Sequence, residues 1–153
     1  MTPLDKGQLW VMRIHGAVAA VLLLLAGAVG DAVLQDAVEL RRGLVVLPLL
    51  LPAIWIAFFA PGRRFRAWGY AMDADELQVR RGLLVNVHTS VPLDRVQHLD
   101  IAQGPLERAF AVSRLIVHTA GTLHSQVTLP GLPRPVAEAM RDEIRARIRQ
   151  EAA

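Results

Sequence analysis

Cysteine is absent from the 153-residue sequence, and aromatic residues make up only 5% of it. The missing thiols exclude disulfide bonds and thiolate chemistry, and they leave the redox compartment undetermined. The sequence also has no Gly-x-Gly-x-x-Gly, P-loop, His-Glu-x-x-His or Gly-x-Ser-x-Gly signature, so no motif indicates a nucleotide, zinc-protease or serine-hydrolase site. We therefore expect no enzymatic activity, no catalytic residue and no cofactor.

Charged residues are missing from two long stretches, 14–30 and 43–62. At about 1.5 Å per helical residue, each stretch could cross most of a hydrocarbon core that is roughly 30 Å thick. We predict two transmembrane helices, at about 14–30 and 43–61, in an N-terminal tail and hairpin covering residues 1–62. Two alternatives stay open: the first run could be a cleaved signal peptide, or both runs could be buried in a soluble protein.

Small residues and prolines indicate how the two helices pack. Gly16 and Ala20 lie four residues apart in the first run, a spacing that lets helix backbones approach closely. We expect this face to pack against the second helix. Pro48 and Pro52 should bend the second helix or delay its regular start, because proline has no backbone N–H to donate.

The basic residues beside the runs predict the topology. Lys6 and Arg13 precede the first run, and Arg63, Arg64, Arg66, Arg80 and Arg81 follow the second. By the positive-inside rule, both termini face the cytoplasm of a multi-pass inner or plasma membrane protein, although Arg41 and Arg42 between the runs weaken the bias. The C-terminal part is then cytoplasmic.

Residues 63–153 show the pattern of a separate, mainly β domain. Trp68, Tyr70 and Met72 alternate on one face of a candidate strand, and Leu77 and Val79 begin a second strand after a turn at 73–75. Further candidate strands cover 83–88, 96–102, 115–119 and 126–129. Short strands at this spacing favour an antiparallel sandwich or barrel.

The end of the chain predicts an amphipathic helix. Pro133 and Pro135 mark its start, and an apolar residue then recurs every four residues at Val136, Met140, Ile144 and Ile148. We therefore predict a helix at about 135–150 that closes the barrel.

Four segments, in this order, resemble a known family: YAMDADELQVRRGLL, VPLDRVQHLDIAQGPLERAFAV, LIVHTAG and LPGL. They are similar to the bacterial pleckstrin-homology-like (PH-like) membrane proteins of the YdbS-like family, in which a pair of membrane helices precedes the domain. The resemblance covers roughly Tyr70 to Leu132 and the preceding hairpin. The motif positions to which it assigns a structural or interaction role are Tyr70, Gly82, Pro92, Arg95, Gln97, Arg108, Phe110 and Gly121.

This resemblance implies a PH-like barrel on the cytoplasmic face of the membrane and no active group. It also implies, as one possible partner, a related membrane protein that carries several copies of the same domain. Two positions depart from the family pattern. Ala111 stands where the family prefers glycine, so the turn after Phe110 is expected to be less sharp, and Asp94 replaces a small polar residue.

Basic residues give a candidate ligand site. Arg63, Arg64 and Arg66 should emerge from the membrane at headgroup level, where each could gain about 1 kcal/mol from anionic lipid. Arg80 and Arg81 could extend this patch from a hairpin. The plainer alternative is that the first three arginines only fix the topology. Nucleic acid is disfavoured as a ligand, because the C-terminal helix is mixed in charge and has no aromatic platform beside it.

Histidines offer another kind of site. His88, His98, His118 and His124 fall in or beside predicted strands, and they could bind a metal if they converged with Asp100. None of them shows close ligand spacing, so we predict no metal site and keep a small metal protein or enzyme as the second alternative. An arginine such as Arg95 or Arg108 is expected to bond turn carbonyls or a nearby acid such as Glu107 or Asp94.

The sequence thus predicts a two-helix membrane anchor that carries a PH-like interaction module, assembling with related membrane proteins in an envelope or stress-defence role. The first alternative is recognition of anionic lipid headgroups by the juxtamembrane arginines and the hairpin.

Overall fold

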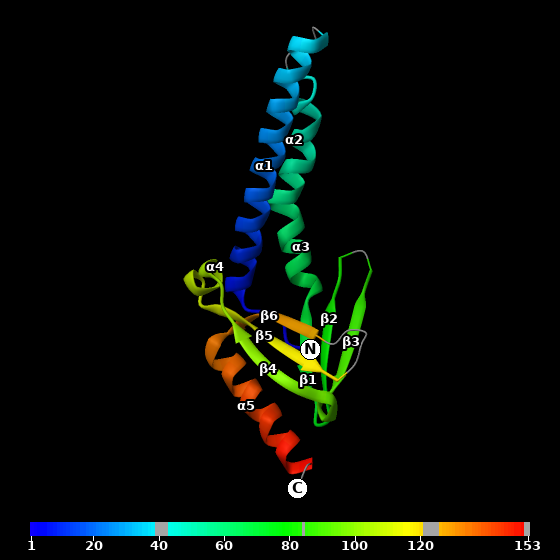
Figure 1. Ribbon diagram of the computed structural model, residues 1–153, viewed down its shortest axis with the longest axis vertical. Helices are drawn as coiled ribbons and strands as arrows, with labels where there is room; N and C mark the ends of the chain where they lie inside the picture. Colours follow the sequence, from blue (N-terminus) through cyan, green and yellow to red (C-terminus); the bar gives the residue numbers. More distant parts are fainter. Residues whose placement is uncertain (39–42, 84, 121–125, 152–153) are drawn as a thin grey trace. The chain divides into compact units, whose positions relative to one another are not determined.

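The computed structural model describes residues 1–38, 43–83, 85–120 and 126–151 (Figure 1). Its contacts divide the chain into two compact units, which we call the helical unit and the sheet unit. The helical unit is Met12–Arg63, and the sheet unit is Arg64–Ala153 together with Met1–Val11. Residues 1–11, placed with the hairpin by the sequence prediction, therefore make their contacts with the sheet unit.

The helical unit consists of two antiparallel helical segments. The first is α1 (Lys6–Val38), whose residues from Met12 onward belong to this unit. The second comprises α2 (Val46–Ile54), the π-helical turn η1 (Trp55–Phe59) and the residues of α3 (Ala60–Ala67) up to Arg63. By length and composition, Lys6–Gln35 and Val46–Ala67 could each cross a membrane, and most of their side chains are exposed. Both extend beyond the predicted spans because the helices continue into the polar residues that flank the apolar runs.

Glycines bring the two helical segments of this unit close together, and Gly16 lies on the face that was predicted to pack. A Cβ atom added to Gly16 would lie 2.6 Å from the carbonyl oxygen of Ile56, and one added to Gly27 would lie 2.6 Å from a methyl of Leu49. Real Cβ atoms essentially never approach so closely. At Gly16 a side chain would require the neighbouring backbone to shift, whereas at Gly27 a movement of the Leu49 side chain would be enough.

The second helical segment is irregular near its prolines. Pro52 lies inside α2, and the backbone N–H of Trp55 is shared between the carbonyls of Leu51 and Pro52. Pro61 has no N–H to donate back to the carbonyl four residues earlier, which falls in the π-helical turn. The second helical segment thus contains a π-turn at Trp55–Phe59, and the bend predicted at Pro48 and Pro52 stays a prediction.

The first sheet of the sheet unit is an antiparallel meander. It contains β1 (Gly69–Met72), β2 (Glu76–Arg81) and β3 (Val87–Pro92), in that order. The turn predicted at 73–75 connects β1 to β2, and the Asp73 N–H donates to the Glu76 carbonyl at 2.9 Å. The predicted strand at 83–88 is confirmed only at Val87 and His88, because β3 begins at Val87.

The second sheet is also antiparallel, and it carries most of the core. It contains β4 (Val96–Ala102), β5 (Val112–Thr119) and β6 (Gln126–Pro133) in the order β4-β5-β6. The 3-10 turn η2 (Leu93–Arg95) leads into β4, and α4 (Pro105–Ala109) connects β4 to β5. Leu115, Val117 and Leu129 are fully buried in this sheet.

The C-terminal helix α5 (Arg134–Glu151) packs on this second sheet and on η2 (Figure 1). Ala137, Met140 and Ile144 are buried along it. The predicted helix is confirmed, but its stripe starts one residue later than expected: Val136 is 39% exposed and Ala137 replaces it in the core. The stripe follows the α-helical period of 3.6 residues rather than a strict spacing of four.

The N-terminal segment Met1–Val11 completes the sheet unit. Thr2 and Tyr70 exchange two backbone hydrogen bonds, of 2.6 and 3.0 Å, and the Asp5 N–H donates to the Gly131 carbonyl at 2.9 Å. Leu4 and Val11 are each only 4% exposed. The segment thus ties the beginning of the chain to both β1 and β6.

The fold class is confirmed in its coarser features, which are two membrane-length helical segments, a mainly β unit and a C-terminal helix. Within the described ranges, strand pairing forms two separate three-stranded sheets, and no pairing joins one sheet to the other. The closed barrel stays a prediction.

Candidate functional site

A shallow pocket of about 280 Å³ lies at the end of the first sheet, and we call it the hairpin pocket. Two segments of the chain line it. Arg64 and Trp68 come from the end of α3 and the residue after it, and four residues come from the β2–β3 hairpin: Arg81, Gly82, Leu83 and Val87. Two arginines about 17 positions apart in the sequence, together with an indole and two aliphatic side chains, therefore share one concave surface.

The hairpin beside this pocket exposes apolar side chains. Leu83, Val85 and Val87 are 36%, 72% and 39% exposed. Their alternation in the sequence predicts a strand with one buried face instead. Arg80 and Arg81 precede them and are exposed as well. Val87 pairs with Arg81 in the sheet register, so an apolar and a basic side chain lie opposite each other where the hairpin begins.

Gly82 sets the shape of this hairpin. Its φ is +131°, a conformation that side-chain-bearing residues rarely adopt. A Cβ atom at this position would lie 1.8 Å from the carbonyl oxygen of Val85. The chain therefore turns here only because residue 82 is glycine.

The base of the hairpin is held by a charged hydrogen-bond cluster. The Glu76 carboxylate accepts hydrogen bonds from the Ser90 hydroxyl and from the Gln78 side-chain amide. These two bonds, with Ser90 contributing more, hold the pKa of Glu76 below its usual value. Glu76 is thus ionised at neutral pH and links β2 to β3.

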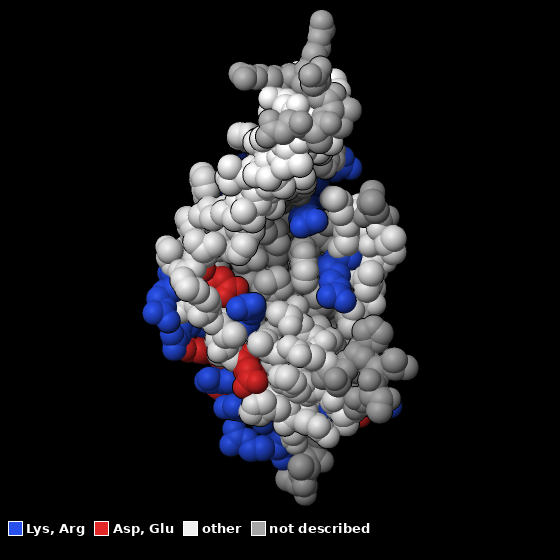
Figure 2. All heavy atoms as spheres, turned by 45° about the horizontal axis from the view of Figure 1, so that its top comes forward, with Lys and Arg blue, Asp and Glu red and all other residues white. Residues whose placement is uncertain are grey.

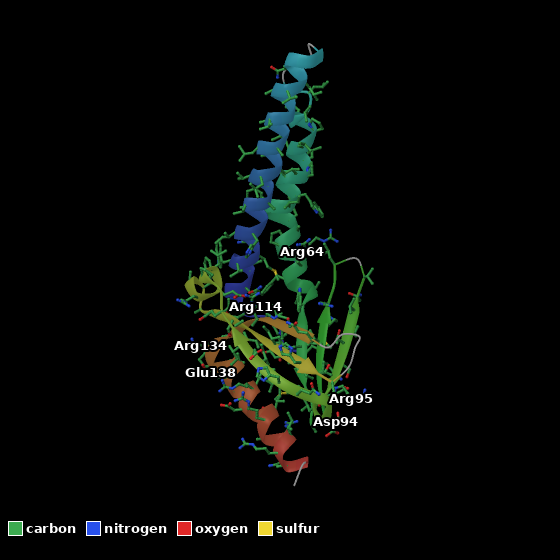
Figure 3. The ribbon with its side chains drawn as sticks, in the orientation of Figure 1. Arg64, Asp94, Arg95, Arg114, Arg134 and Glu138 are labelled. Carbon is green, nitrogen blue, oxygen red and sulfur yellow. The ribbon has the colours of Figure 1, made fainter. Side chains whose placement is uncertain are left out.

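The five arginines predicted as one patch separate in the structure. Arg64 and Arg81 line the hairpin pocket, and Arg64 extends from α3 in the direction of the hairpin (Figure 3). Arg80 is exposed on β2, and Arg66 is exposed on α3 without lining the pocket. Arg63 belongs to the helical unit, where its guanidinium lies 5.6 Å from the centre of the Trp55 ring. Basic side chains outnumber acidic ones on the face seen in Figure 2.

Most of the family-motif positions have structural roles. Tyr70 pairs with Thr2, and burial raises the pKa of its hydroxyl. Phe110 stacks on Trp10 with ring centres 6.4 Å apart. Pro92 ends β3, and the Arg95 carbonyl accepts the Ala120 N–H at 3.0 Å. Gln97 and Arg108 are exposed, and Gly121 lies outside the described residues.

Glu107, one of the acids that the sequence offers as a partner for Arg95 or Arg108, pairs with a different arginine. Glu107 is buried, and its carboxylate pairs with Arg114 at 3.2 Å rather than with Arg108. The same carboxylate accepts the Gly104 N–H at 2.6 Å and so caps α4. The sequence does not indicate this pair, because Arg114 lies on β5 and approaches Glu107 of α4 only once the chain has folded.

The turn after Phe110 forms despite the alanine. Ala111 has a φ of +55°, in the left-handed region, and its N–H reaches the Arg108 carbonyl at 3.2 Å. The expectation of a less sharp turn is therefore wrong. Alanine adopts the conformation that glycine would adopt, at a cost of about 1 kcal/mol.

Two of the four strand histidines meet Asp100. His98 and His118 face each other across β4 and β5, and their Nε2 atoms lie 2.8 and 3.3 Å from the two carboxylate oxygens of Asp100. His88 lies on β3 in the other sheet, and His124 falls outside the described residues. Among the residues that the structure describes, no group of three potential ligands is arranged to hold a metal ion.

Comparisons with known proteins find similarity to a bacterial PH domain family and to a transmembrane protein. A family model described as "Bacterial PH domain" matches residues 14–148. The UPF0699 transmembrane protein YdbS of Bacillus subtilis (strain 168) is 35% identical over 95 residues, which cover 62% of this chain and 58% of that protein. The match thus spans somewhat more than half of the relative's length. No solved structure matches.

Proposed function

Because the chain belongs to the bacterial PH domain family and contains two membrane-length helical segments, we propose that it is a membrane-anchored, non-catalytic interaction protein whose hairpin pocket contacts anionic lipid headgroups. One observation carries this proposal. Arg64 and Arg81, which are distant in sequence, line one shallow pocket beside exposed apolar side chains. Such a surface combines cationic groups for phosphate with aliphatic groups for the acyl boundary.

The covalent structure favours a lipid ligand over a soluble anion. Arg64 lies in the last turn of the second candidate span, Val46–Ala67, and Trp68 follows directly after it. Arginine and tryptophan at the end of a membrane helix tend to lie at headgroup level. The hairpin pocket shares these two residues, so it stays within a few residues of the bilayer surface.

If the hairpin pocket contacts anionic lipid, replacing its two arginines should weaken that contact by a measurable factor. The chain has no cysteine, so a Val85→Cys variant can carry one environment-sensitive fluorophore at the exposed hairpin. In nanodiscs, anionic lipid should shift this fluorophore to an apolar environment. Replacing Arg64 and Arg81 by glutamine should weaken the contact about 30-fold, because each arginine near an anionic surface contributes about 1 kcal/mol.

The matched control replaces two exposed arginines outside the pocket, Arg95→Gln with Arg108→Gln. This pair changes the net charge equally and should leave the fluorophore's response intact. An equal response in both double variants would remove the hairpin pocket as the lipid contact.

The proposed contact requires the sheet unit to lie on the cytoplasmic side, where anionic lipid is concentrated. Leu44 is exposed between α1 and α2, and Ala139 is exposed on α5. In intact cells, a membrane-impermeant maleimide should label a Leu44→Cys variant, whereas an Ala139→Cys variant should react only after lysis. The opposite labelling pattern would contradict the topology.

Assembly with related membrane proteins is the second candidate function. The observation in its favour is an open strand edge on the sheet unit: β4 lies at the end of the order β4-β5-β6. An open edge of this kind can accept an extended segment from another chain.

A further inference from the structure

A groove follows the open edge of β4 on the sheet unit, and we call it the edge groove. It consists of two adjoining cavities, of about 290 and 470 Å³, which share Leu99 and Arg145 in their walls. One wall is β4 and the other is α5, which runs along the strand (Figure 1), and both Gln103 and the β5 residue Ser113 also line the smaller cavity. The hairpin pocket has none of these lining residues.

The β4 wall is formed by the backbone edge of the strand. Every residue from Val96 to Ile101 lines one of the two cavities. Successive side chains of a strand point to opposite faces, so an unbroken run of lining residues means that the edge itself borders the groove. In the described part of the chain, β4 pairs only with β5, which leaves its other row of backbone groups for a further strand.

The dimensions of this edge suit a short extended segment. At about 3.3 Å per residue, the six residues from Val96 to Ile101 cover roughly 20 Å, the length of a typical strand. Leu99 and Ile148 provide apolar contacts in the groove, and Leu99 is only 5% exposed.

The charges on the α5 wall of the groove favour a negatively charged ligand. Four arginines of α5 line the groove, Arg134, Arg141, Arg145 and Arg149, against Glu138 and Asp100. Four of these six charges are engaged locally. Arg134 pairs with Glu138 at 2.9 Å (Figure 3), Arg141 with Asp142 at 2.9 Å, and Asp100 with two histidines. No acidic side chain in the described ranges forms an ion pair with Arg145 or Arg149. The hydrogen bond from Arg141, and then the charges of Arg141, Arg145 and Arg149, lower the pKa of Asp142, so Arg145 and Arg149 interact with an acid that Arg141 already engages. The four arginines still outnumber Glu138, Asp100 and Asp142, so the groove carries a net positive charge.

From this geometry we infer that the edge groove binds an extended acidic segment of a partner protein, which adds as a strand to β4 and places carboxylates against Arg145 and Arg149. This inference rests on the second proposed function, assembly, and names its surface and ligand chemistry. A second copy of this chain fits less well, because pairing two β4 edges would bring the arginines of both α5 helices together.

A direct test measures peptide binding to the full chain in nanodiscs of neutral lipid, which separates this contact from the anionic-lipid contact. The probe is a fluorescent Glu-Val-Glu-Val-Glu-Val-Glu peptide, followed by anisotropy. Two further peptides have the same length: one carries lysine in place of glutamate, and one carries the acidic sequence with alternate backbone nitrogens methylated. We expect the acidic peptide to bind and both others to bind at least about tenfold more weakly, because the first loses charge complementarity and the second loses backbone donors.

Protein variants locate the contact on α5. Arg145→Glu should weaken binding of the acidic peptide about tenfold, whereas Arg108→Glu, an equal charge change on exposed α4, should leave it unchanged. Undiminished binding of the methylated peptide would overturn strand addition, and equal affinities of the two variants would overturn the edge groove. Neither result bears on the lipid contact of the hairpin pocket, since its arginines are intact in both variants.

As a backbone measurement, amide hydrogen exchange of Val96–Ile101 should slow when the acidic peptide is bound. A slowing confined to the hairpin at 81–87 would instead assign the peptide to the lipid-facing surface and overturn the inference. Self-association of the chain without peptide, accompanied by protection of β4, would identify a second copy as the occupant and would likewise overturn it.

Discussion

A fragment that contains only residues 64–153 should fail to unfold cooperatively, whereas the same fragment preceded by residues 1–11 and a flexible glycine-serine linker should do so. The reason is that residues 1–11 supply part of the core of the sheet unit. Leu4, Gln8 and Val11 are all buried, and Thr2 extends the β1 edge by a two-bond bridge to Tyr70. Thermal unfolding followed by circular dichroism distinguishes the two polypeptides.

The same prediction holds in the full chain for a single side chain. Leu4→Ala should cost about 2 to 5 kcal/mol, the range for truncating a buried leucine. For a unit of about 100 residues, 1 kcal/mol corresponds to roughly 4 to 8 °C, so the melting temperature should fall by at least about 8 °C. The control Val136→Ala removes a half-exposed aliphatic group from α5 and should change the melting temperature little. Equal stability of the fragments with and without residues 1–11 would show that this segment is dispensable.

This N-terminal packing was not predictable from the sequence, and the reason is physical. Residues 1–11 are too few to show a helix or strand period, and their contacts with Tyr70 and Gly131 join positions far apart in the chain. The membrane-length runs were predictable because a lipid environment imposes its constraint locally, on every residue of a continuous stretch. Helix α5 was predictable for a similar reason, since its apolar stripe repeats over several turns.

The candidate site was predictable in composition but not in arrangement. The sequence named Arg64 and Arg81 together with Arg63, Arg66 and Arg80, and only the fold separates the two that share a pocket from the three that do not. Leu83, Val85 and Val87 alternate as they would in a half-buried strand, but they are exposed at a hairpin. Alternation indicates that such residues share a face, and it does not indicate whether protein or another phase covers that face.

The exposed apolar residues of the hairpin support the proposed contact with lipid. A soluble monomer gains nothing from exposing three aliphatic side chains beside two arginines, whereas a protein anchored in lipid can bury them at the acyl boundary. The pocket and the hairpin therefore depend on the same local geometry. That geometry is set by one residue, Gly82.

Gly82→Ala should abolish the anionic-lipid response of the Val85→Cys fluorophore and lower the stability of the sheet unit. The φ of +131° alone should cost about 1 to 3 kcal/mol for a residue with a side chain. The Cβ atom would also lie 1.8 Å from a backbone oxygen, which no side-chain rotation relieves, so the connection from β2 to β3 must change shape. Gly69→Ala is the matched control, because its Cβ would meet its nearest neighbours at an ordinary 3.7 Å.

Replacing Ala111 by glycine tests the same preference of glycine for positive φ, at a position where this chain departs from the family pattern. Ala111 already occupies the left-handed region, so Ala111→Gly should stabilise the sheet unit by about 0.5 to 1 kcal/mol. This gain should leave the lipid response unchanged, because Ala111 lines neither the hairpin pocket nor the edge groove. If Gly82→Ala instead preserved both melting temperature and lipid response, the hairpin could not have the shape on which the proposed lipid contact depends.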